Sequence, residues 1–174
     1  MPTFRTLDDL DLAGKRVLLR VDMNVPMRDG AITDTARIEK IIPTITEILS
    51  NGAGIVLASH LGRPKGQAVP EFSLEPLAPV LGSLLPDREV IFSADGSHQA
   101  APGEIVLLEN LRFNPGEEGN DPAFAKSLAA HGDIYVDDAF SCAHRAHASI
   151  DGVARLLPAA AGRLMQQELD ALNN

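Results

Sequence analysis

Residues 17–25 read VLLRVDMNV, a run of Val and Leu that is interrupted by one arginine and leads to Asp22 and Asn24. A short, continuous apolar run of this kind is typical of a strand buried on both faces of a parallel sheet. Similar runs follow it at Ile55 to Ser59, Ile105 to Leu108, Ile134 to Val136 and, more weakly, Val90 to Phe92. These runs predict four buried parallel strands and a weaker fifth.

Helical patterns separate the strands. Residues Thr35 to Leu49 have apolar side chains near helical spacing and end at Asn51-Gly52, although Pro43 lies inside and would kink or shorten the helix. Further helices are predicted at Leu74 to Leu85, Pro122 to His131 and Gly162 to Leu172. Strands and helices that alternate in this way form right-handed crossovers. We therefore expect a three-layer α/β/α domain with a mainly parallel, Rossmann-like sheet.

Composition narrows the class of protein. A chain of 174 residues suits one domain, and 45% hydrophobic residues with no Trp imply a core of Val, Ile, Leu and Ala. The net charge of −9 argues against a nucleic-acid partner or an anionic membrane surface. The start of the chain lacks the pattern of a signal peptide, and no apolar run is long enough to span a membrane. A cytoplasmic protein is expected.

Polar and basic side chains follow the predicted strands: Asp22 and Asn24, then His60 and Arg63, then Asn110 and Arg112, then Asp138, His144 and Arg145, while Arg37 opens the first helix. The carboxyl ends of parallel strands meet at one edge, so these residues should form a cationic cluster. Two like charges about 5 Å apart repel by roughly 3 kcal/mol at an effective dielectric constant of about 20. An anion with a phosphate and a carboxylate would relieve this repulsion, and arginine pairs well with both groups.

Other interpretations remain open for individual residues. Asp22 and Asn24 could merely cap a turn, and a single surface arginine is usually solvated. Cys142 is the only cysteine, which excludes an intramolecular disulfide, and it is expected to be a small buried residue. Glu117 and Glu118, in an acidic loop over residues 114–122, are expected to face water.

Two kinds of site are not expected. His144 and His147 form an HRAH motif, but no Cys or carboxylate completes a familiar zinc spacing with them. The run IYVDD at 134–138 is similar to the magnesium-binding strand of P-loop enzymes. However, the chain contains no GxxxxGK[ST] loop, so a P-loop nucleotide hydrolase is improbable.

The chain also carries a series of longer motifs: RVDMNVP (20–26), TARI (35–38), SHLGRPKG (59–66), LLENLRFNPGEE (107–118) and DDAFSCAHRAHAS (137–149). In identity and order they resemble the phosphoglycerate kinase family, over essentially the whole chain. The resemblance implies glycolytic phosphoryl transfer between 1,3-bisphosphoglycerate and ADP, giving 3-phosphoglycerate and ATP. It also implies two α/β domains, the N-terminal one for phosphoglycerate and the C-terminal one for the magnesium nucleotide.

Carried onto matching positions, the resemblance implies a substrate-binding set with Arg20 and His144 in support: Asp22, Met23, Asn24, Arg37, His60, Leu61, Gly62, Arg63, Arg112 and Arg145. It assigns catalysis to Arg37, which would stabilise charge on the transferring group. Two departures are visible, since Asp137 stands where many members have Asn, and Ser141-Cys142 replaces the frequent Gly-Thr. Neither departure is expected to touch the binding residues.

The resemblance finally implies that residues 1–174 are the N-terminal 3-phosphoglycerate-binding domain, because the chain stops at Asn174, before the family's nucleotide-binding segments. Mg-ATP or Mg-ADP would be bound by the absent C-terminal domain, and this chain would bind no cofactor and no metal. We expect a monomer that is inactive alone and whose partner is its own C-terminal domain. The alternative is a non-catalytic anion-binding module on the same fold.

Overall fold

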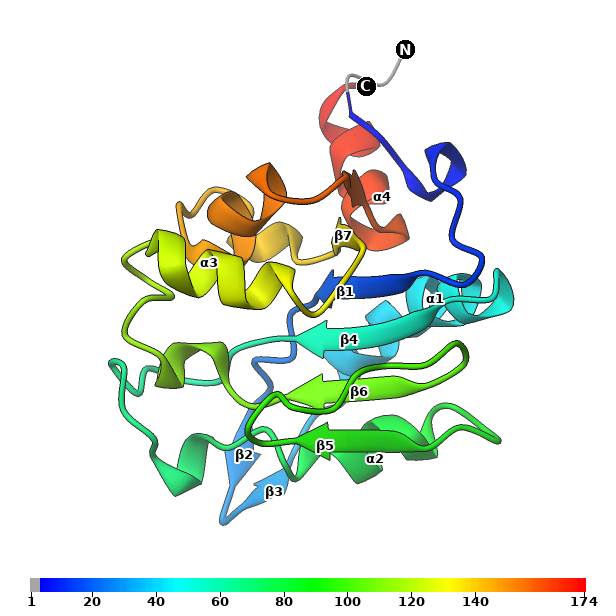
Figure 1. Ribbon diagram of the computed structural model, residues 1–174. Coiled ribbons are helices and arrows are strands. Elements are labelled where there is room, and N and C mark those ends of the chain that lie inside the picture. The colour runs from blue at the N-terminus through cyan, green and yellow to red at the C-terminus, as the bar shows by residue number, and fades with distance from the viewer. Residues whose placement is uncertain (1–3) are drawn as a thin grey trace.

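A parallel sheet of six strands runs through the computed structural model, which describes residues 4–174, in the order β5-β6-β4-β1-β7-β8 (Figure 1). Every pairing in this sheet is parallel. Its strands are β1 (Arg16–Arg20), β4 (Gly54–Ala58), β5 (Val90–Ser93), β6 (Ile105–Leu108), β7 (Ile134–Asp137) and β8 (Ala159–Ala161). A separate antiparallel hairpin joins β2 (Met27–Arg28) to β3 (Ala31–Ile32).

Helices cover both faces of the sheet. They are α1 (Ala36–Ser50), α2 (Leu77–Ser83), α3 (Pro122–Ala129) and α4 (Arg163–Leu172). In Figure 1, α1 and α2 lie behind the sheet and α3 lies in front of it. Short helical turns fill the connections: η1 (Leu7–Asp9), η2 (Pro70–Phe72), η3 (Leu111–Phe113), η4 (Phe140–Cys142), η5 (Ala148–Gly152) and η6 (Val153–Arg155). The predicted three-layer, Rossmann-like α/β/α class is confirmed.

Strand β1 shows how the sheet builds two cores. Val17 and Leu19 belong to the core shared with α1 and α2, whereas Leu18 belongs to the core shared with α3. This alternation follows from the two-residue period of a strand. Each of these side chains is at least 99% buried, which stabilises the fold by roughly 1.5–3 kcal/mol per side chain. Arg20, two residues after Leu18, extends toward the α3 side, where it meets Ser149 of η5.

The first strand is shorter than the apolar run that predicts it. It ends at Arg20 rather than at Val25, because local hydrogen bonds replace the strand pairing there. The Asp22 carboxylate accepts the N–H of Asn24 at 3.0 Å, and Val25 donates its N–H to the Met23 carbonyl at 2.8 Å. The chain therefore turns as soon as it leaves the sheet.

Helix α1 continues past Pro43 without interruption to Ser50. Pro43 is exposed on the outer side of the helix, and the expected shortening is absent. The predicted stop is confirmed, because Asn51 closes the helix with its N–H on the Glu47 carbonyl at 3.2 Å. Across residues 4–174, none of the helices has both the length and the apolar character needed to cross a membrane.

Candidate anion-binding site

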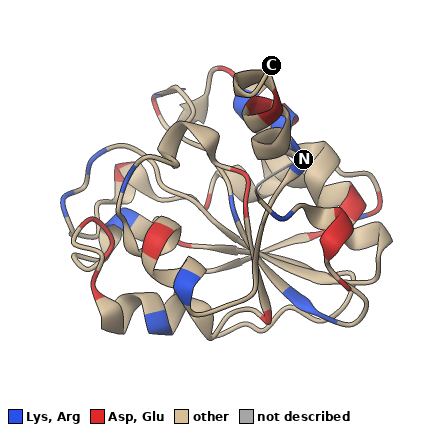
Figure 2. Cartoon of the chain, turned by 90° about the horizontal axis from the view of Figure 1, so that it is seen from above, with Lys and Arg blue, Asp and Glu red and all other residues tan. Residues whose placement is uncertain are grey.

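The strands of the sheet bring their carboxyl ends to one edge, on the left in Figure 1. The segments that leave this edge carry the polar residues predicted from the sequence: Asp22 and Asn24 after β1, His60 and Arg63 after β4, Asn110 and Arg112 after β6, and Asp138, His144 and Arg145 after β7. Figure 2 shows Lys and Arg segments on loops of that same left side. The predicted gathering of basic residues at the carboxyl edge is therefore present.

Arg20 is the buried centre of this cluster, with 1% of its surface exposed. Its Nε donates to the Ser149 hydroxyl at 2.9 Å, and its Nη1 donates to the Val21 carbonyl at 2.6 Å. Its Nη2 lies 2.9 Å from Nδ1 of His60. Within residues 4–174, Arg20 has no carboxylate at ion-pair distance, so neutral acceptors surround a buried positive charge.

His60 lies between several positive charges. It is 4% exposed, and burial together with the charges of Arg20 and Arg112 lowers its pKa to about 3. The carboxylate of Asp22 opposes this pKa shift, and Arg145 adds to it. His60 is therefore an uncharged imidazole at neutral pH, in contact with Arg20 and under the electrostatic influence of Arg112 and Arg145.

Arg112 is held by the turn that follows β6. The Asn110 side chain accepts the N–H of Arg112 at 3.0 Å and donates to the Leu61 carbonyl at 2.7 Å. The guanidinium donates to the Gly62 carbonyl at 3.1 Å, and its Nε lies 3.4 Å from a Glu118 carboxylate oxygen. Burial lowers the pKa of Arg112, an effect that the Glu118 charge opposes.

The segment after β4 is fixed to the segment after β1. Gly62 donates its N–H to the Asn24 side-chain oxygen at 3.0 Å and has a φ of +64°, a conformation that favours glycine. A Cβ atom at Gly62 would lie 2.6 Å from the Phe72 ring. The side chains of Leu61 and Met23 are buried in the core, so these two residues can offer a ligand only backbone atoms.

Arg37, in the first turn of α1, is half exposed and pairs with Asp22. Its Nη1 lies 3.3 Å from both Asp22 carboxylate oxygens and 3.0 Å from the Asn24 carbonyl. Ser141 also donates its hydroxyl to Asp22, at 2.7 Å, so the expectation that position 141 stays clear of the binding residues is wrong. Asp22 caps a turn and makes these ion-pair contacts at once.

A cavity of about 200 Å³ opens beside this pair. Its lining combines charges of both signs with apolar surface: Asp22, Arg37, Lys40, Asp138, Phe140, Ser141, Leu164 and Glu168. Asp138 is fully buried and accepts the N–H of Met165 at 3.0 Å, which ties the end of β7 to α4. This hydrogen bond joins two elements of the fold.

The remaining predicted residues are exposed. Arg63, His144 and Arg145 make no side-chain hydrogen bond or ion pair within the part of the chain that the structure describes. Cys142 is buried, as predicted. His144 and His147 belong to no group of three potential metal ligands among residues 4–174. The cluster therefore has a buried half, around Arg20, and an exposed half, around Arg145.

Glu117 is buried, so the expectation from the sequence that it faces water is wrong. The residue is 0% exposed, and its two carboxylate oxygens accept the N–H of Ser149 at 2.8 Å and the Ser149 hydroxyl at 2.5 Å. Glu118 is exposed but pairs with Arg112. An acidic GEE loop carries no local signal for burial, because the partner Ser149 lies 32 residues further along the chain.

The fold and this edge define a class: a parallel α/β domain with a candidate anion-binding site at the carboxyl ends of its strands. The sequence model of the family described as phosphoglycerate kinase matches residues 7–174, and the chain belongs to this family.

Relatives support this assignment over nearly the whole chain. The chain is 56% identical over 181 aligned residues to a phosphoglycerate kinase of Agrobacterium fabrum, covering 99% of this chain and 45% of that protein. It is 58% identical to one of a Ruegeria species, covering 97% of this chain and 44% of that protein. A solved phosphoglycerate kinase structure from Coxiella burnetii superposes with a TM-score of 0.92 at 42% identity, covering 98% of this chain and 44% of that one. The chain thus spans somewhat under half the length of these relatives.

Proposed function

We propose that this chain binds 3-phosphoglycerate at its carboxyl edge, as the N-terminal, triose-binding domain of a phosphoglycerate kinase. The observation that carries the proposal is the group of Arg20, His60, Arg112 and Arg145, gathered at one edge of a chain whose net charge is −9. A ligand with a phosphate and a carboxylate matches this site, because arginine pairs with both groups through two parallel hydrogen bonds. The whole protein would interconvert 1,3-bisphosphoglycerate and ADP with 3-phosphoglycerate and ATP.

The buried and exposed parts of the cluster would divide the work of binding. His60 and Arg112 are fixed by neighbouring residues and would supply a preorganised floor. Arg63 and Arg145 are exposed and free to close on the phosphate or the carboxylate. Asp22 and Asn24, at the start of the first loop, would contact the triose, with support from His144 and from the backbone of Met23, Leu61 and Gly62.

Arg37 is our candidate catalytic residue. Phosphoryl transfer needs cations aimed at the equatorial oxygens of the transferring group. Arg37 now pairs with Asp22, which is only 16% exposed, but the Arg37 side chain is 53% exposed, and Asp22 keeps the Ser141 hydroxyl and the Asn24 N–H as donors when Arg37 leaves. On this proposal, Arg37 exchanges Asp22 for the transferring phosphoryl group.

The magnesium nucleotide is the second substrate, and we propose that residues outside this chain hold it. The sequence contains no GxxxxGK[ST] phosphate loop, and no group of three potential metal ligands occurs among residues 4–174. The chain also covers only 45% of the length of a phosphoglycerate kinase such as that of Agrobacterium fabrum. On this proposal the partner is the enzyme's own C-terminal domain, and the work is done in the cytoplasm by a monomer.

Calorimetric titration of the chain with 3-phosphoglycerate tests the binding half of the proposal, with glycerate as a control ligand that lacks the phosphate. We expect saturable binding of 3-phosphoglycerate and a stability gain of about 2.7 kcal/mol at a hundred times the dissociation constant. A melting temperature that stays flat across the titration would contradict it. An assay with ATP tests the domain assignment, because turnover by this chain alone would overturn it.

A further inference from the structure

Glu117 is a buried carboxylate for which the proposed function gives no role. Both of its oxygens are occupied by one residue, Ser149, through the main-chain N–H at 2.8 Å and the hydroxyl at 2.5 Å. Its own carbonyl accepts the N–H of Ala148 at 2.9 Å. The Tyr135 hydroxyl completes the arrangement by donating to the Ser149 carbonyl at 2.7 Å. Glu117 therefore fixes Ser149 from two sides.

The direction of each hydrogen bond along this path follows from the chemistry of the groups. The Ser149 hydroxyl donates its single proton to Glu117, so it faces Arg20 as an acceptor. A guanidinium can only donate, so the Nη2 of Arg20 must donate to Nδ1 of His60 across their 2.9 Å contact. Nδ1 therefore carries no proton, and the ring proton of His60 lies on Nε2.

We propose that Glu117, acting through Ser149 and Arg20, is a positioning residue that fixes His60 as the neutral tautomer whose Nε2–H donates to an anionic ligand. The inference rests on the proposed function for the identity of that ligand, but not for the tautomer. Nε2 has no hydrogen-bond partner within residues 4–174, so it is the ring nitrogen left for a ligand. A neutral donor contributes a hydrogen bond without adding another charge to the crowded arginines.

The charges that face His60 favour this state from several elements. Arg20 of β1, Arg112 of η3 and Arg145 after β7 all disfavour a protonated ring, and only Asp22 favours it. Those charges keep the ring neutral, but they do not choose between its two nitrogens. The contact with Arg20 makes that choice, and the hydrogen bonds from Glu117 through Ser149 hold Arg20 in position to make it.

A Glu117→Gln variant breaks the path with little change in shape. An amide has one oxygen and one NH₂ group, whereas Ser149 presents donors to both positions. Whichever way the amide turns, its NH₂ meets an N–H or competes for the hydroxyl oxygen that holds Arg20. Ser149→Ala is the second variant, because it removes only the hydroxyl that accepts from Arg20.

The test is long-range ¹⁵N–¹H correlation spectroscopy of the histidine rings in the uniformly labelled chain, without ligand. In the wild type, His60 should show an unprotonated Nδ1 and a protonated Nε2, unchanged from about pH 8 to about pH 5. In Glu117→Gln and in Ser149→Ala, the signals should shift toward a mixture of tautomers. Their affinity for 3-phosphoglycerate should fall about tenfold.

Glu109→Gln is the matched control. Glu109 is a partly buried carboxylate just after β6, and it accepts from the Ser73 hydroxyl at 2.7 Å, from the Leu74 N–H at 2.8 Å and from the Asn110 N–H at 2.8 Å. It makes no contact with the path from Glu117 to His60, so this variant should lose stability in urea without moving the His60 signals.

Two results would overturn the proposal: a wild-type His60 with its proton on Nδ1, or wild-type His60 signals in both Glu117→Gln and Ser149→Ala. If the tautomer responds as expected but the wild type fails to bind 3-phosphoglycerate, the positioning role stands and the proposed function fails. If the wild type binds 3-phosphoglycerate strongly but neither variant changes the tautomer, the proposed function stands and the positioning role of Glu117 fails.

Discussion

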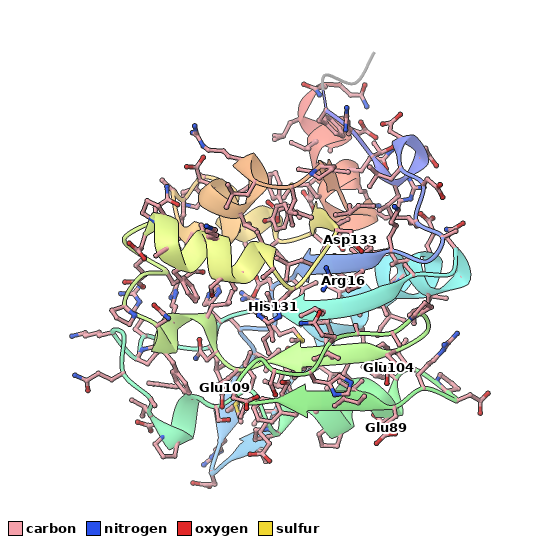
Figure 3. All side chains as sticks on the ribbon, viewed as in Figure 1. Arg16, Glu89, Glu104, Glu109, His131 and Asp133 are labelled. Atoms are coloured by element: carbon pink, nitrogen blue, oxygen red, sulfur yellow. The ribbon has the colours of Figure 1, made fainter. Side chains whose placement is uncertain are left out.

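Strand β1 carries an arginine at each end, and the two have opposite surroundings. Arg16, at the amino end, lies beside Asp133 and its guanidinium donates to that carboxylate at 3.2 Å, with both side chains partly exposed (Figure 3). It also contacts the Gln99 side chain. Arg20, at the carboxyl end, is buried among neutral acceptors. The charge of Arg16 is neutralised by an ion pair at the amino edge, whereas Arg20 has no ion-pair partner at the carboxyl edge within residues 4–174.

The largest expected difference is in stability. Arg20→Ala should lower the free energy of unfolding by about 3–5 kcal/mol, because it leaves buried acceptors on Ser149 and His60 without a donor. Arg16→Ala should lower it by about 1 kcal/mol or less, because its partners are reached by water. Urea unfolding of both variants measures the difference. Equal losses would show that burial at the carboxyl end is not what separates the two arginines.

The ends of β1 should also respond differently to pH. A histidine in the unfolded chain takes up a proton near pH 6.5, whereas folded His60 has a pKa of about 3. Acid therefore favours the unfolded chain, and His60 makes the free energy of unfolding fall as the pH drops below about 6.5. The slope approaches about 1.4 kcal/mol per pH unit. At the amino end, the hydrogen bonds from Arg16 lower the pKa of Asp133 below 3.8, so its contribution is lost only in stronger acid.

Asp137, the register partner of Arg20 on β7, should have the opposite effect to His60 on how stability depends on pH. Burial raises the pKa of Asp137 to about 6, so its contribution to stability is present at low pH and is lost as the pH rises through about 6. Relative to the wild type, His60→Gln should therefore gain stability as the pH falls from about 6 to about 4, and Asp137→Asn should lose stability over the same range. Chemical unfolding at a series of pH values checks both signs, and parallel curves for the two variants would refute this account.

Two glycines with positive φ sharpen the comparison at a smaller scale. Gly62, at the carboxyl edge, would place a Cβ 2.6 Å from the Phe72 ring, whereas Gly14, just before β1, has nothing within 4 Å of that position. Both alanine variants carry a left-handed penalty of about 1–2 kcal/mol, but only Gly62→Ala adds a clash with the edge of the Phe72 ring, at about 1 kcal/mol, for a total of about 2–3 kcal/mol. Thermal unfolding compares them, and equal values would mean that Phe72 moves aside freely.

The smallest effect on stability is expected at the exposed part of the cluster. Arg145→Ala should change the free energy of unfolding by less than about 0.5 kcal/mol, since its side chain has no partner within residues 4–174. The affinity of the Arg145→Ala variant for 3-phosphoglycerate should nevertheless fall about tenfold, because a charge-assisted hydrogen bond is lost. Arg88→Ala, at an exposed arginine before β5, is the control and should leave the affinity unchanged. Calorimetry at two salt concentrations separates the variants, and equal affinities would remove Arg145 from the site.

The sequence predicts the sheet well wherever Val, Ile and Leu carry the signal. Strand β6 occupies the predicted residues Ile105 to Leu108. Strand β8 escapes prediction, because Ala159–Ala161 contains only alanine, which has no preference for strands. The β2–β3 hairpin escapes as well, since each of its strands has only two residues.

At the candidate site, the sequence predicts the polar residues that follow the strands, but it does not predict the buried residues that hold those side chains in place. His60 and Arg112 are found because topology alone brings strand ends together. Glu117 and Ser149 are missed because a polar residue in a loop has the same local signature whether it is buried or solvated. Only the packing of η5 against the loop before α3 decides which it is.

The alternation along β1 also determines which kinds of genetic change the protein tolerates. Val17 and Leu19 face one core and Leu18 faces the other, so the loss or gain of one codon between them would turn Arg20 away from Ser149 and toward α1. A substitution in this strand changes one side chain, whereas a change in its length reverses the facing of every side chain beyond it. The exposed Asp29-Gly30 turn between β2 and β3 has no such restriction. Insertions and deletions among relatives should therefore accumulate at that turn and be absent from β1.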